Sequence, residues 1–594
     1  MITFDKPKAS QFFELVKTSD FDVSPTEDQI VFSANISGEF ELWGMDTDSR
    51  FPYKLTSIGE RCHSLMYSKD GSFIIASFDH EGDENAQIYA LPRNGGTLKP
   101  LVQKEGQRHM VEGLSGDGTL LFYNTTDENP TYLNTNTYDL QTGEIRTIHT
   151  GETTPTFLAA KNEGETKLIL GKSFANTHSV PYLLEDGELI PFVENPDLAY
   201  TFESVVFVSD TDIYFTTNYE ADLSYLAHFN TKTKTMKKVV ELAGIELKDL
   251  KVNQAKDLLY ITASAGVEEK MYQFDIKNQK ISDLKLPVTN IAKAVLSKQD
   301  TLYLAGGTAT QPINLYTLNN EQQWKALTKI HVSGLDQQEL SEPQVLTYKS
   351  FDDLEIETLY FKARPQVDNK HLILWPHGGP QSSEGKFFRA MFQHLIYEGY
   401  NIVAPNFRGS SDYGSAFMKM VEGDWGHGPR LDNIACVDYM IDQGYVDKDK
   451  VLLMGGSYGG YMALLLHGRH PDYFKAVVDI FGVSNLFSFY DSVPEFWKPM
   501  MKTWIGDPIE DKERFTRDSP ITYLETMTKP MLVIQGANDP RVVKAESDQI
   551  VESLRAQGTE VEYLVFEDEG HGFSKKENEI KVSERVLAFF NQVI

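Results

Sequence analysis

The feature that most constrains the fold is a short unit that recurs along the first half of the chain. In each copy a Ser or Asn opens a polar turn, and a run of apolar and β-branched residues follows. The copies are Ser24–Phe32, Ser68–Ala76, Ser115–Tyr123, Asn162–Leu170, Ser209–Phe215, Asn253–Ile261 and Ser297–Leu304. Their spacing of roughly 44 to 48 residues is typical of a propeller blade. The copy at Asn162–Leu170 matches the pattern least well.

Further strand patterns follow most of these units, for example Glu41–Asp46 and Tyr138–Gly143, as expected for hairpins of an antiparallel blade. The repeats therefore predict a seven-bladed β-propeller over residues 18–334, after a short N-terminal extension at 1–17. A set of unrelated β-sandwich domains is the alternative. Near-equal periods repeated this often favour the propeller.

The pattern changes near residue 335 to alternating strands and helices. An alternating segment at 344–361 predicts a hairpin at the sheet edge. Six apolar runs follow as strands, at 371–375, 401–404, 451–454, 476–480, 531–534 and 561–565. Helical patterns lie between them at 432–443, 461–470 and 545–557. Strands that are apolar on both faces indicate a mostly parallel, doubly wound sheet covered by helices. Residues 335–594 are of normal length for one such domain.

The sequence Gly-Gly-Ser-Tyr-Gly-Gly at 455–460 lies between a predicted strand and a predicted helix. This is a G-x-S-x-G motif in the context that an α/β-hydrolase nucleophile requires. The glycines avoid collisions at a sharp turn that exposes the hydroxyl of Ser457. A glycine-rich phosphate-binding turn is the alternative, but no Lys-Ser/Thr pair follows the motif.

A serine nucleophile needs a general base and an acidic residue that orients the base. Asp539 follows the strand at 531–534, and His571 follows the strand at 561–565. The order Ser, Asp, His is that of the α/β-hydrolase fold, so Ser457, Asp539 and His571 are the predicted triad. The carboxylates of Glu567, Asp568 and Glu569 compete for the acid role, and we expect them to be solvated loop charges.

The sequence Pro-His-Gly-Gly-Pro at 376–380 follows the strand at 371–375. It matches the loop that supplies one backbone amide to an oxyanion hole, and the amide of Tyr458 is the expected second donor. His377 in this loop is interpreted as a hydrogen-bonding brace, because a metal site would need further ligands at close spacing.

Composition excludes several classes of partner. The net charge of −30 disfavours nucleic acid and anionic membrane surfaces. Two cysteines, Cys62 and Cys436, are too few for a disulfide framework or a cysteine-rich zinc site, and no metal or cofactor is predicted. The chain begins without a signal-peptide pattern and has no apolar run long enough for a membrane span. We therefore expect a cytoplasmic protein.

Together these motifs resemble the prolyl oligopeptidase family of serine peptidases. The segments 377–380 and 406–414 are similar to its acylaminoacyl-peptidase branch. The resemblance implies that the amides of Gly379 and Tyr458 form the oxyanion hole. It also implies that Arg541 binds a substrate carbonyl, that Val542 lines the specificity pocket, and that the propeller admits only short peptides. A surface salt bridge is the alternative role of Arg541. Homo-oligomers are common in the family, so a homodimer or another homo-oligomer is expected.

The function that follows is a serine exopeptidase that releases N-acylated amino acids from short peptides. An oligopeptidase or dipeptidyl peptidase, a carboxylesterase, and a propeller interaction module tethered to a hydrolase are the alternatives. The dipeptidyl branch of the family holds a free amine with a Glu pair. The adjacent pair in this chain, Glu268-Glu269, is expected to be a solvated hairpin tip.

Overall fold

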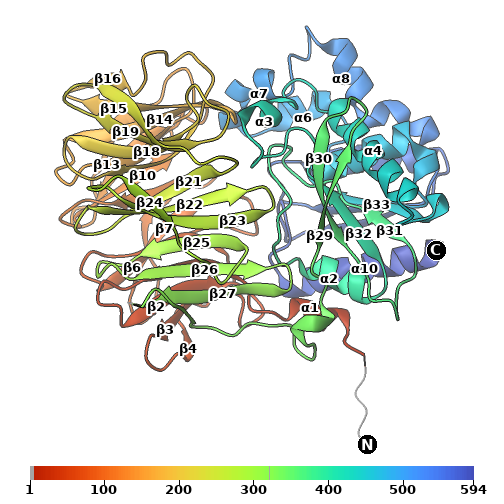
Figure 1. The fold of residues 1–594 in the computed structure, drawn as a ribbon, viewed down its shortest axis with the longest axis horizontal. Coiled ribbons are helices and arrows are strands. Elements are labelled where there is room, and N and C mark those ends of the chain that lie inside the picture. Colours follow the sequence, from red (N-terminus) through yellow and green to blue (C-terminus); the bar gives the residue numbers. More distant parts are fainter. Residues whose placement is uncertain (1–5, 320) are drawn as a thin grey trace, which may run out of the picture.

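The chain forms two domains that lie side by side (Figure 1). The computed structural model describes residues 6–319 and 321–594. The first domain contains seven sheets of four strands each, and the second is built on one sheet of eight strands. The predicted fold class, a seven-bladed β-propeller followed by an α/β-hydrolase domain, is therefore confirmed.

Each blade consists of four strands that are consecutive in the chain. Blades 1 and 2 contain β1 (Thr18–Val23), β2 (Gln29–Ala34), β3 (Glu41–Asp46), β4 (Pro52–Lys54), β5 (Cys62–Tyr67), β6 (Phe73–Phe78), β7 (Gln87–Pro92) and β8 (Lys99–Val102). Blades 3 and 4 contain β9 (His109–Leu114), β10 (Leu120–Thr125), β11 (Asn134–Asp139), β12 (Ile145–Thr150), β13 (Thr156–Lys161), β14 (Lys167–Ala175), β15 (His178–Glu185) and β16 (Glu188–Pro191). Blade 5 contains β17 (Phe202–Phe207), β18 (Asp212–Thr217), β19 (Tyr225–Asn230) and β20 (Thr235–Val240). Blades 6 and 7 contain β21 (Glu246–Val252), β22 (Leu258–Ala265), β23 (Glu268–Asp275), β24 (Lys280–Asp283), β25 (Asn290–Leu296), β26 (Leu302–Thr308), β27 (Gln311–Leu318) and β28 (Trp324–Ala326).

The recurring Ser or Asn lies in the turn between the first and second strands of a blade. Its side-chain oxygen accepts a hydrogen bond from the backbone N–H at the start of the second strand. The donor–acceptor distance is 2.8 Å for Ser115 and Leu120, and 3.0 Å for Asn162 and Lys167. The weakest copy of the repeat therefore makes the same turn. A short polar side chain is needed because it replaces a backbone partner within the turn.

Apolar side chains close the ring of blades. Phe21 and Val23 of β1 share a core cluster with Tyr303 and Ala305 of β26. Since each sheet uses consecutive strands, the described first and last blades meet through side-chain packing and share no strand.

The hydrolase sheet has the order β29-β30-β32-β31-β33-β34-β35-β36. Its strands are β29 (Gln344–Lys349), β30 (Glu355–Phe361), β31 (Leu372–Leu374), β32 (Asn401–Pro405), β33 (Val451–Gly456), β34 (Val477–Ile480), β35 (Met531–Gly536) and β36 (Val561–Phe566). The hairpin β29–β30 joins β32 antiparallel, and all later pairings are parallel. The carboxyl ends of β33, β35 and β36 therefore meet at one edge, where α/β sheets bind ligands.

Helices cover both faces of this sheet. On one face lie α2 (Ala390–Tyr397) and α10 (Lys576–Val593), and on the other lie α4 (Gly428–Asp442), α5 (Tyr458–Arg469) and α9 (Lys544–Ala556). The domain also contains α3 (Ser415–Lys419), α6 (Leu486–Ser492), α7 (Lys498–Trp504) and α8 (Lys512–Asp518). Short 3₁₀ turns occur at η1 (Gln337–Glu339), η2 (Lys448–Lys450), η3 (Pro471–Tyr473), η4 (Glu495–Trp497) and η5 (Pro520–Thr526). In the described residues, no helix has the length and apolar character needed to cross a bilayer.

The N-terminal extension packs against the hydrolase domain. Its helix α1 (Ala9–Phe13) lies at the boundary between the domains, near α2 and α10 (Figure 1). Phe12 is fully buried, and its ring lies 5.4 Å from the ring of His394 and 5.6 Å from that of Tyr397. This apolar contact ties the N-terminal end of the propeller segment to the second domain.

The pair Glu268-Glu269 lies at the hairpin between β22 and β23, as predicted, but both side chains have partners instead of being solvated. Glu268 pairs with Lys386 of the hydrolase domain at 2.5 Å. Glu269 accepts hydrogen bonds from the side chain of Asn290 and the backbone N–H of Ile291. Both carboxylates therefore serve the interface and the start of blade 7.

Candidate active site

Ser457 lies in the tight turn between β33 and α5, with φ = 57° and ψ = −122°. This left-handed conformation is unusual for a residue other than glycine, and such strain clusters at functional sites. The helix begins directly at Tyr458 instead of near Tyr461, so the helix N-terminus lies beside the nucleophile. A Cβ on Gly460 would come within 2.5 Å of Asp479 Oδ1, which explains why this turn needs glycine.

Asp479, on β34 behind this turn, is fully buried. One of its oxygens accepts the backbone N–H of Gly482 at 3.0 Å. The other has no hydrogen-bond partner in the part of the chain that the structure describes. Burial raises the pKa of Asp479 to about 7. A proton on this carboxyl therefore stabilises the folded state near neutral pH.

The structure brings Ser457, His571 and Asp539 into one hydrogen-bonded chain. His571 Nε2 lies 2.9 Å from Ser457 Oγ, and His571 Nδ1 lies 2.6 Å from Asp539 Oδ2. The ring of His571 also packs against that of Phe481, with 4.7 Å between centroids. With Asp539 accepting at Nδ1, the imidazole presents its Nε2 lone pair to the serine hydroxyl. This arrangement can take up the proton of Ser457 during nucleophilic attack.

Asp539 is held by the loop that follows it. Its Oδ1 accepts the backbone N–H groups of Arg541 and Val542, each at 2.9 Å. Its side chain has no solvent exposure. Because three donors surround the carboxylate, its negative charge is stabilised although it is buried, and its orientation toward His571 is fixed.

The loop at 376–380 passes beside the nucleophile. A Cβ on Gly378 would lie 3.4 Å from Ser457 Cβ, and Gly379 has φ = +124°. The amide of Tyr458 is the first of α5, where N–H groups have no partner within the helix. The two predicted oxyanion donors thus belong to segments that flank Ser457 on two sides.

His377 is buried and stacks on Phe407, with 4.2 Å between the ring centroids. Its Nδ1 lies 2.7 Å from Gly378 O, and its Nε2 lies 2.8 Å from Ser410 Oγ. Burial lowers the pKa of His377 to about 4, so the ring is neutral at physiological pH. These contacts agree with a brace that fixes the loop.

Glu569 corrects one expectation from the sequence. It is 1% exposed instead of being a solvated loop charge. Its carboxylate accepts the backbone N–H groups of Ser574 and Lys575 at 2.8 and 3.0 Å, and the side chain of Asn578 at 2.7 Å. These bonds close the loop that carries His571. The backbone N–H groups of Ser574 and Lys575 distinguish Glu569 from its neighbours. A sequence pattern does not show in which direction such backbone groups point.

Arg541 and Val542 have different surroundings. Val542 is 3% exposed and belongs to the main core cluster of the hydrolase domain, together with Phe489 and Val493. The side chain of Arg541 is 42% exposed, and its Nε donates to Glu84 Oε1 of blade 2 at 2.7 Å. The salt bridge that we considered as its alternative role is therefore present, and it joins the two domains. Sequence reasoning missed Glu84 altogether.

A cavity of about 570 Å³ lies between the domains and reaches His571. Blades 1, 2 and 7, the segment after α1, the loop 569–574 and the residues before α2 line it. Its volume is within the range of small-molecule sites. Blade 2 contributes the carboxylates of Glu60, Asp79 and Glu84 together with the basic side chains of Arg61 and His63.

Known proteins are similar to this chain in sequence or in fold. Residues 386–594 match the sequence profile of the prolyl oligopeptidase family. Dipeptidyl aminopeptidase BIII of Pseudoxanthomonas mexicana is 41% identical over 212 residues, which are 35% of this chain and 31% of that protein. Dipeptidyl peptidase family member 6 of Caenorhabditis elegans is 24% identical over 617 residues, which are 91% of this chain and 82% of that protein. The acylamino-acid-releasing enzyme of Arabidopsis thaliana is 28% identical over 247 residues, which are 40% of this chain and 32% of that protein.

The alignments to the bacterial and plant relatives thus span about a third of the length of each of those proteins. Among solved structures, a puromycin-hydrolyzing peptidase of Mycobacterium tuberculosis has a TM-score of 0.87 at 18% identity. That match covers 99% of this chain and 96% of the other. At such low identity the likeness shows a common two-domain fold.

Proposed function

The hydrolase domain of this chain belongs to the prolyl oligopeptidase family of serine peptidases, and we propose that the enzyme releases N-acylated amino acids from short peptides. The hydrogen-bonded chain of Ser457, His571 and Asp539 supports the peptidase part of this proposal. The acyl preference is supported by the charges near Arg541, which are described below.

In the proposed reaction, Ser457 Oγ attacks the scissile carbonyl and His571 Nε2 takes its proton. The amides of Tyr458 and Gly379 stabilise the negative oxygen of the tetrahedral intermediate. His571 then protonates the leaving amine, and an ester of the acyl amino acid with Ser457 remains. His571 next activates a water molecule, which hydrolyses this ester and restores the enzyme.

The observation that carries the acyl preference is the pairing of the propeller carboxylates. Glu84 is the carboxylate that contacts Arg541, and its second oxygen lies 3.2 Å from Arg108 Nη1. Glu268 and Glu269 are engaged at the interface. A substrate ammonium would have to compete with two arginines for Glu84, whereas a neutral acyl carbonyl needs only a donor such as Arg541.

A dipeptidyl peptidase is the second candidate. Glu60 and Asp79 also line the cavity beside His571, and carboxylates favour a substrate with a free amino terminus. Two of the relatives described above are named as dipeptidyl peptidases. These observations favour an exopeptidase that recognises the amine directly.

Three further expectations stay proposals. The propeller restricts access to short peptides, because the cavity lies between the domains. The enzyme acts in the cytoplasm, a reducing compartment that suits two buried free cysteines, Cys62 and Cys436. It forms a homodimer, as the family resemblance implies.

The test compares acetyl-alanine p-nitroanilide with alanyl-alanine p-nitroanilide for the wild type and Ser457→Ala. We expect kcat/KM to be at least about tenfold higher for the acetylated substrate, because its carbonyl meets Arg541 without an unpaired ammonium. Ser457→Ala should lower kcat by about 10⁶-fold. Ser553→Ala in α9 is the matched control and should retain activity.

Preference for the free dipeptide would replace the acyl proposal by the dipeptidyl one. Full activity of Ser457→Ala would remove the proposed nucleophile and, with it, both candidates.

A further inference from the structure

The cavity between the domains lies on the leaving-group side of the catalytic centre. Within residues 6–319 and 321–594, its walls include His571 and the rest of the loop 569–574, but neither Ser457 nor Val542. In the proposed reaction, His571 gives its proton to the amine of the leaving peptide. The leaving part of a peptide cleaved at Ser457 therefore passes His571 and enters this cavity.

The loop of blade 2 between β6 and β7 contacts the segments that carry the catalytic base and its orienting acid. A Cβ on Gly82 would lie 2.7 Å from the backbone nitrogen of Gly570, which precedes His571. The carbonyl of Glu81 accepts the side-chain amide of Asn538 at 3.4 Å. These contacts fix the distance between this part of blade 2 and the catalytic base.

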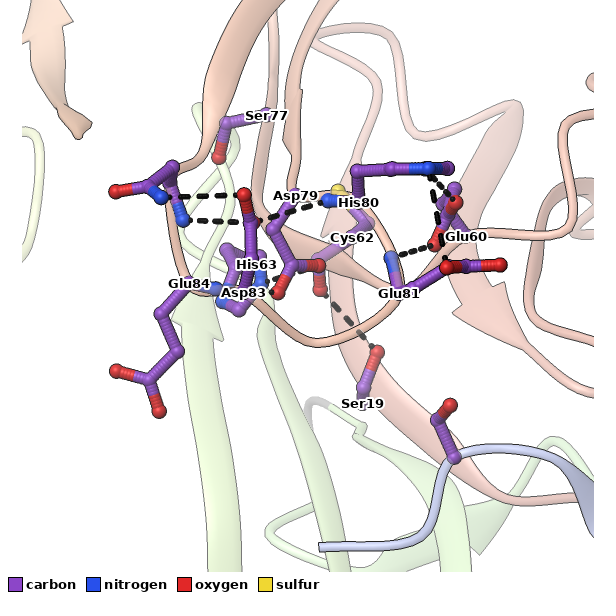
Figure 2. Close-up of polar contacts among 12 residues, drawn as sticks. Ser19, Glu60, Cys62, His63, Ser77, Asp79, His80, Glu81, Asp83 and Glu84 are labelled. Carbon is purple, nitrogen blue, oxygen red and sulfur yellow. Dashed lines mark hydrogen bonds and ion pairs between the residues drawn. The ribbon is translucent and has the colours of Figure 1, made fainter. Parts of the chain in front are cut away.

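Glu60 connects the same loop to the start of β5 (Figure 2). Its carboxylate accepts the backbone N–H of Glu81 at 3.2 Å, and it lies 2.9 Å from Nδ1 of His80. Arg61 follows Glu60 directly in the chain. The backbone that carries Arg61 is therefore held at a fixed position relative to the active site.

The chain on the other side of Arg61 is held by Glu41, which is 2% exposed. This carboxylate accepts the backbone N–H groups of Ile58 and Gly59 at 2.9 and 3.1 Å. Arg61 and His63 are alternate residues at the start of β5, so their side chains point to the same face of the strand. Both of them line the cavity.

Arg61 differs from the other charged side chains around the cavity, because it has no partner in the part of the chain that the structure describes. The lining carboxylates that accept from a cation or an N–H group are Glu60, Asp79, Glu84, Glu569 and Glu579. The lining cations that pair with a carboxylate are Lys17, His63 and Arg389. The Arg61 guanidinium makes no such bond and lies 6.0 Å from the centre of the Phe40 ring.

An unpaired guanidinium at this place selects a particular ligand chemistry. Its planar fork of N–H donors matches the two oxygens of a carboxylate, and such charge-assisted bonds are stronger than bonds between neutral groups. The leaving part of a short peptide ends in an α-carboxylate. A peptide with a blocked carboxyl end, or an anilide, brings no negative charge into the cavity.

From this arrangement we propose that Arg61 binds the C-terminal carboxylate of the leaving peptide. The cavity is then a subsite for short leaving peptides with a free carboxyl end. The proposal rests on the peptidase part of the proposed function, because the leaving group must pass His571, and it does not need the acyl preference. Since Arg61 is held at a fixed distance from Ser457, one length of leaving peptide is favoured.

The test compares acetylated alanine peptides that end in a free carboxylate with the same peptides that end in an amide. The leaving part has one to four alanines, and chromatography measures the released peptide. At the favoured length, we expect kcat/KM to be at least about tenfold higher for the acid than for the amide. Arg61→Ala should reduce this ratio to about one, and Arg61→Glu should invert it. Arg61→Lys should retain part of it, because the charge remains without the fork.

Lys99→Ala is the matched control, because it removes one positive charge from an exposed position of β8 in the same blade, outside the lining of the cavity. It should keep the ratio of the wild type. Acetyl-alanine p-nitroanilide has a leaving group without a carboxylate, so Arg61→Ala should change its kcat/KM less than about twofold. A loss on the anilide equal to that on the acid would overturn the proposal, because Arg61 would then support the structure of the site.

Equal kcat/KM for acid and amide at every length would also overturn it, and so would a ratio that survives Arg61→Ala. The same comparison with unacetylated peptides separates this proposal from the acyl preference. If the unacetylated peptides are cleaved better, the acyl preference fails, and the ratio of acid to amide is still read from them. If no peptide is cleaved, the peptidase function fails and this proposal fails with it.

Discussion

The contact between Gly82 and Gly570 can be tested with a single methyl group. In Gly82→Ala, the new Cβ would lie 2.7 Å from Gly570 N and 2.9 Å from Gly570 Cα, where ordinary contact begins near 3.4 Å. The two loops would have to separate by about 0.7 Å to restore that contact. The left-handed φ of +79° adds about 1–2 kcal/mol of strain for alanine. Displacement of the adjacent His571 by such a distance lowers kcat/KM by about 10- to 100-fold.

Gly187→Ala is a control that introduces the strain of a left-handed alanine without a steric clash. Gly187 has φ = +81°, and a Cβ there would meet nothing within 4 Å. It lies in the hairpin turn between β15 and β16, on blade 4. We expect this control to lose about 1–2 kcal/mol in urea unfolding and to keep wild-type kcat/KM. The assay is steady-state hydrolysis of the preferred anilide beside urea denaturation. If the two variants lose the same stability and both keep full activity, the inferred coupling of this contact to His571 is refuted.

Three further substitutions test groups in and behind the site. Asp539→Asn should lower kcat about 10⁴-fold, because the amide no longer enforces the required tautomer of His571; unchanged kcat would contradict this role. Glu569→Gln should cost about 2 kcal/mol in urea unfolding and also lower kcat, because a buried charged acceptor is lost from the His571 loop; stability equal to that of the wild type would argue against this restraint. The raised pKa of Asp479, about 7, means that the folded state retains a proton that the unfolded state loses, so stability falls as pH rises from about 4 to 7. Asp479→Asn should reduce this fall in the free energy of unfolding by up to about 4 kcal/mol. Urea unfolding at pH 4, 5.5 and 7.5 measures it, and an unaltered fall would mean that other titrating groups cause the pH dependence.

The order and placement of the proposed triad could be predicted because each member depends on a local pattern. Ser457, Asp539 and His571 each follow a short apolar run at a glycine-containing turn. A parallel sheet brings the ends of such strands to the same edge without further information. The blades were predictable for a similar reason, because a Ser or Asn that accepts the first N–H of a strand leaves a short, repeated pattern.

The environment of individual carboxylates could not be predicted from the sequence. Glu567, Asp568 and Glu569 are adjacent and chemically similar, and only the positions of the N–H groups of Ser574 and Lys575 single out Glu569 for burial. The contact between Glu84 and Arg541 joins residues 457 positions apart. Such pairings arise from how two domains dock, so neither residue carries a local pattern that indicates its partner.

The facing glycines at 82 and 570 also bear on how such enzymes diverge. Each backbone occupies the space that a side chain on the other would need, so neither position can accept a larger residue while the other stays in place. A chimera that combines this hydrolase domain with the propeller of a relative therefore needs a small residue and a left-handed turn at the equivalent of position 82. The two domains are expected to be inherited as a matched pair, and recombination between relatives should succeed only where this turn is conserved in shape.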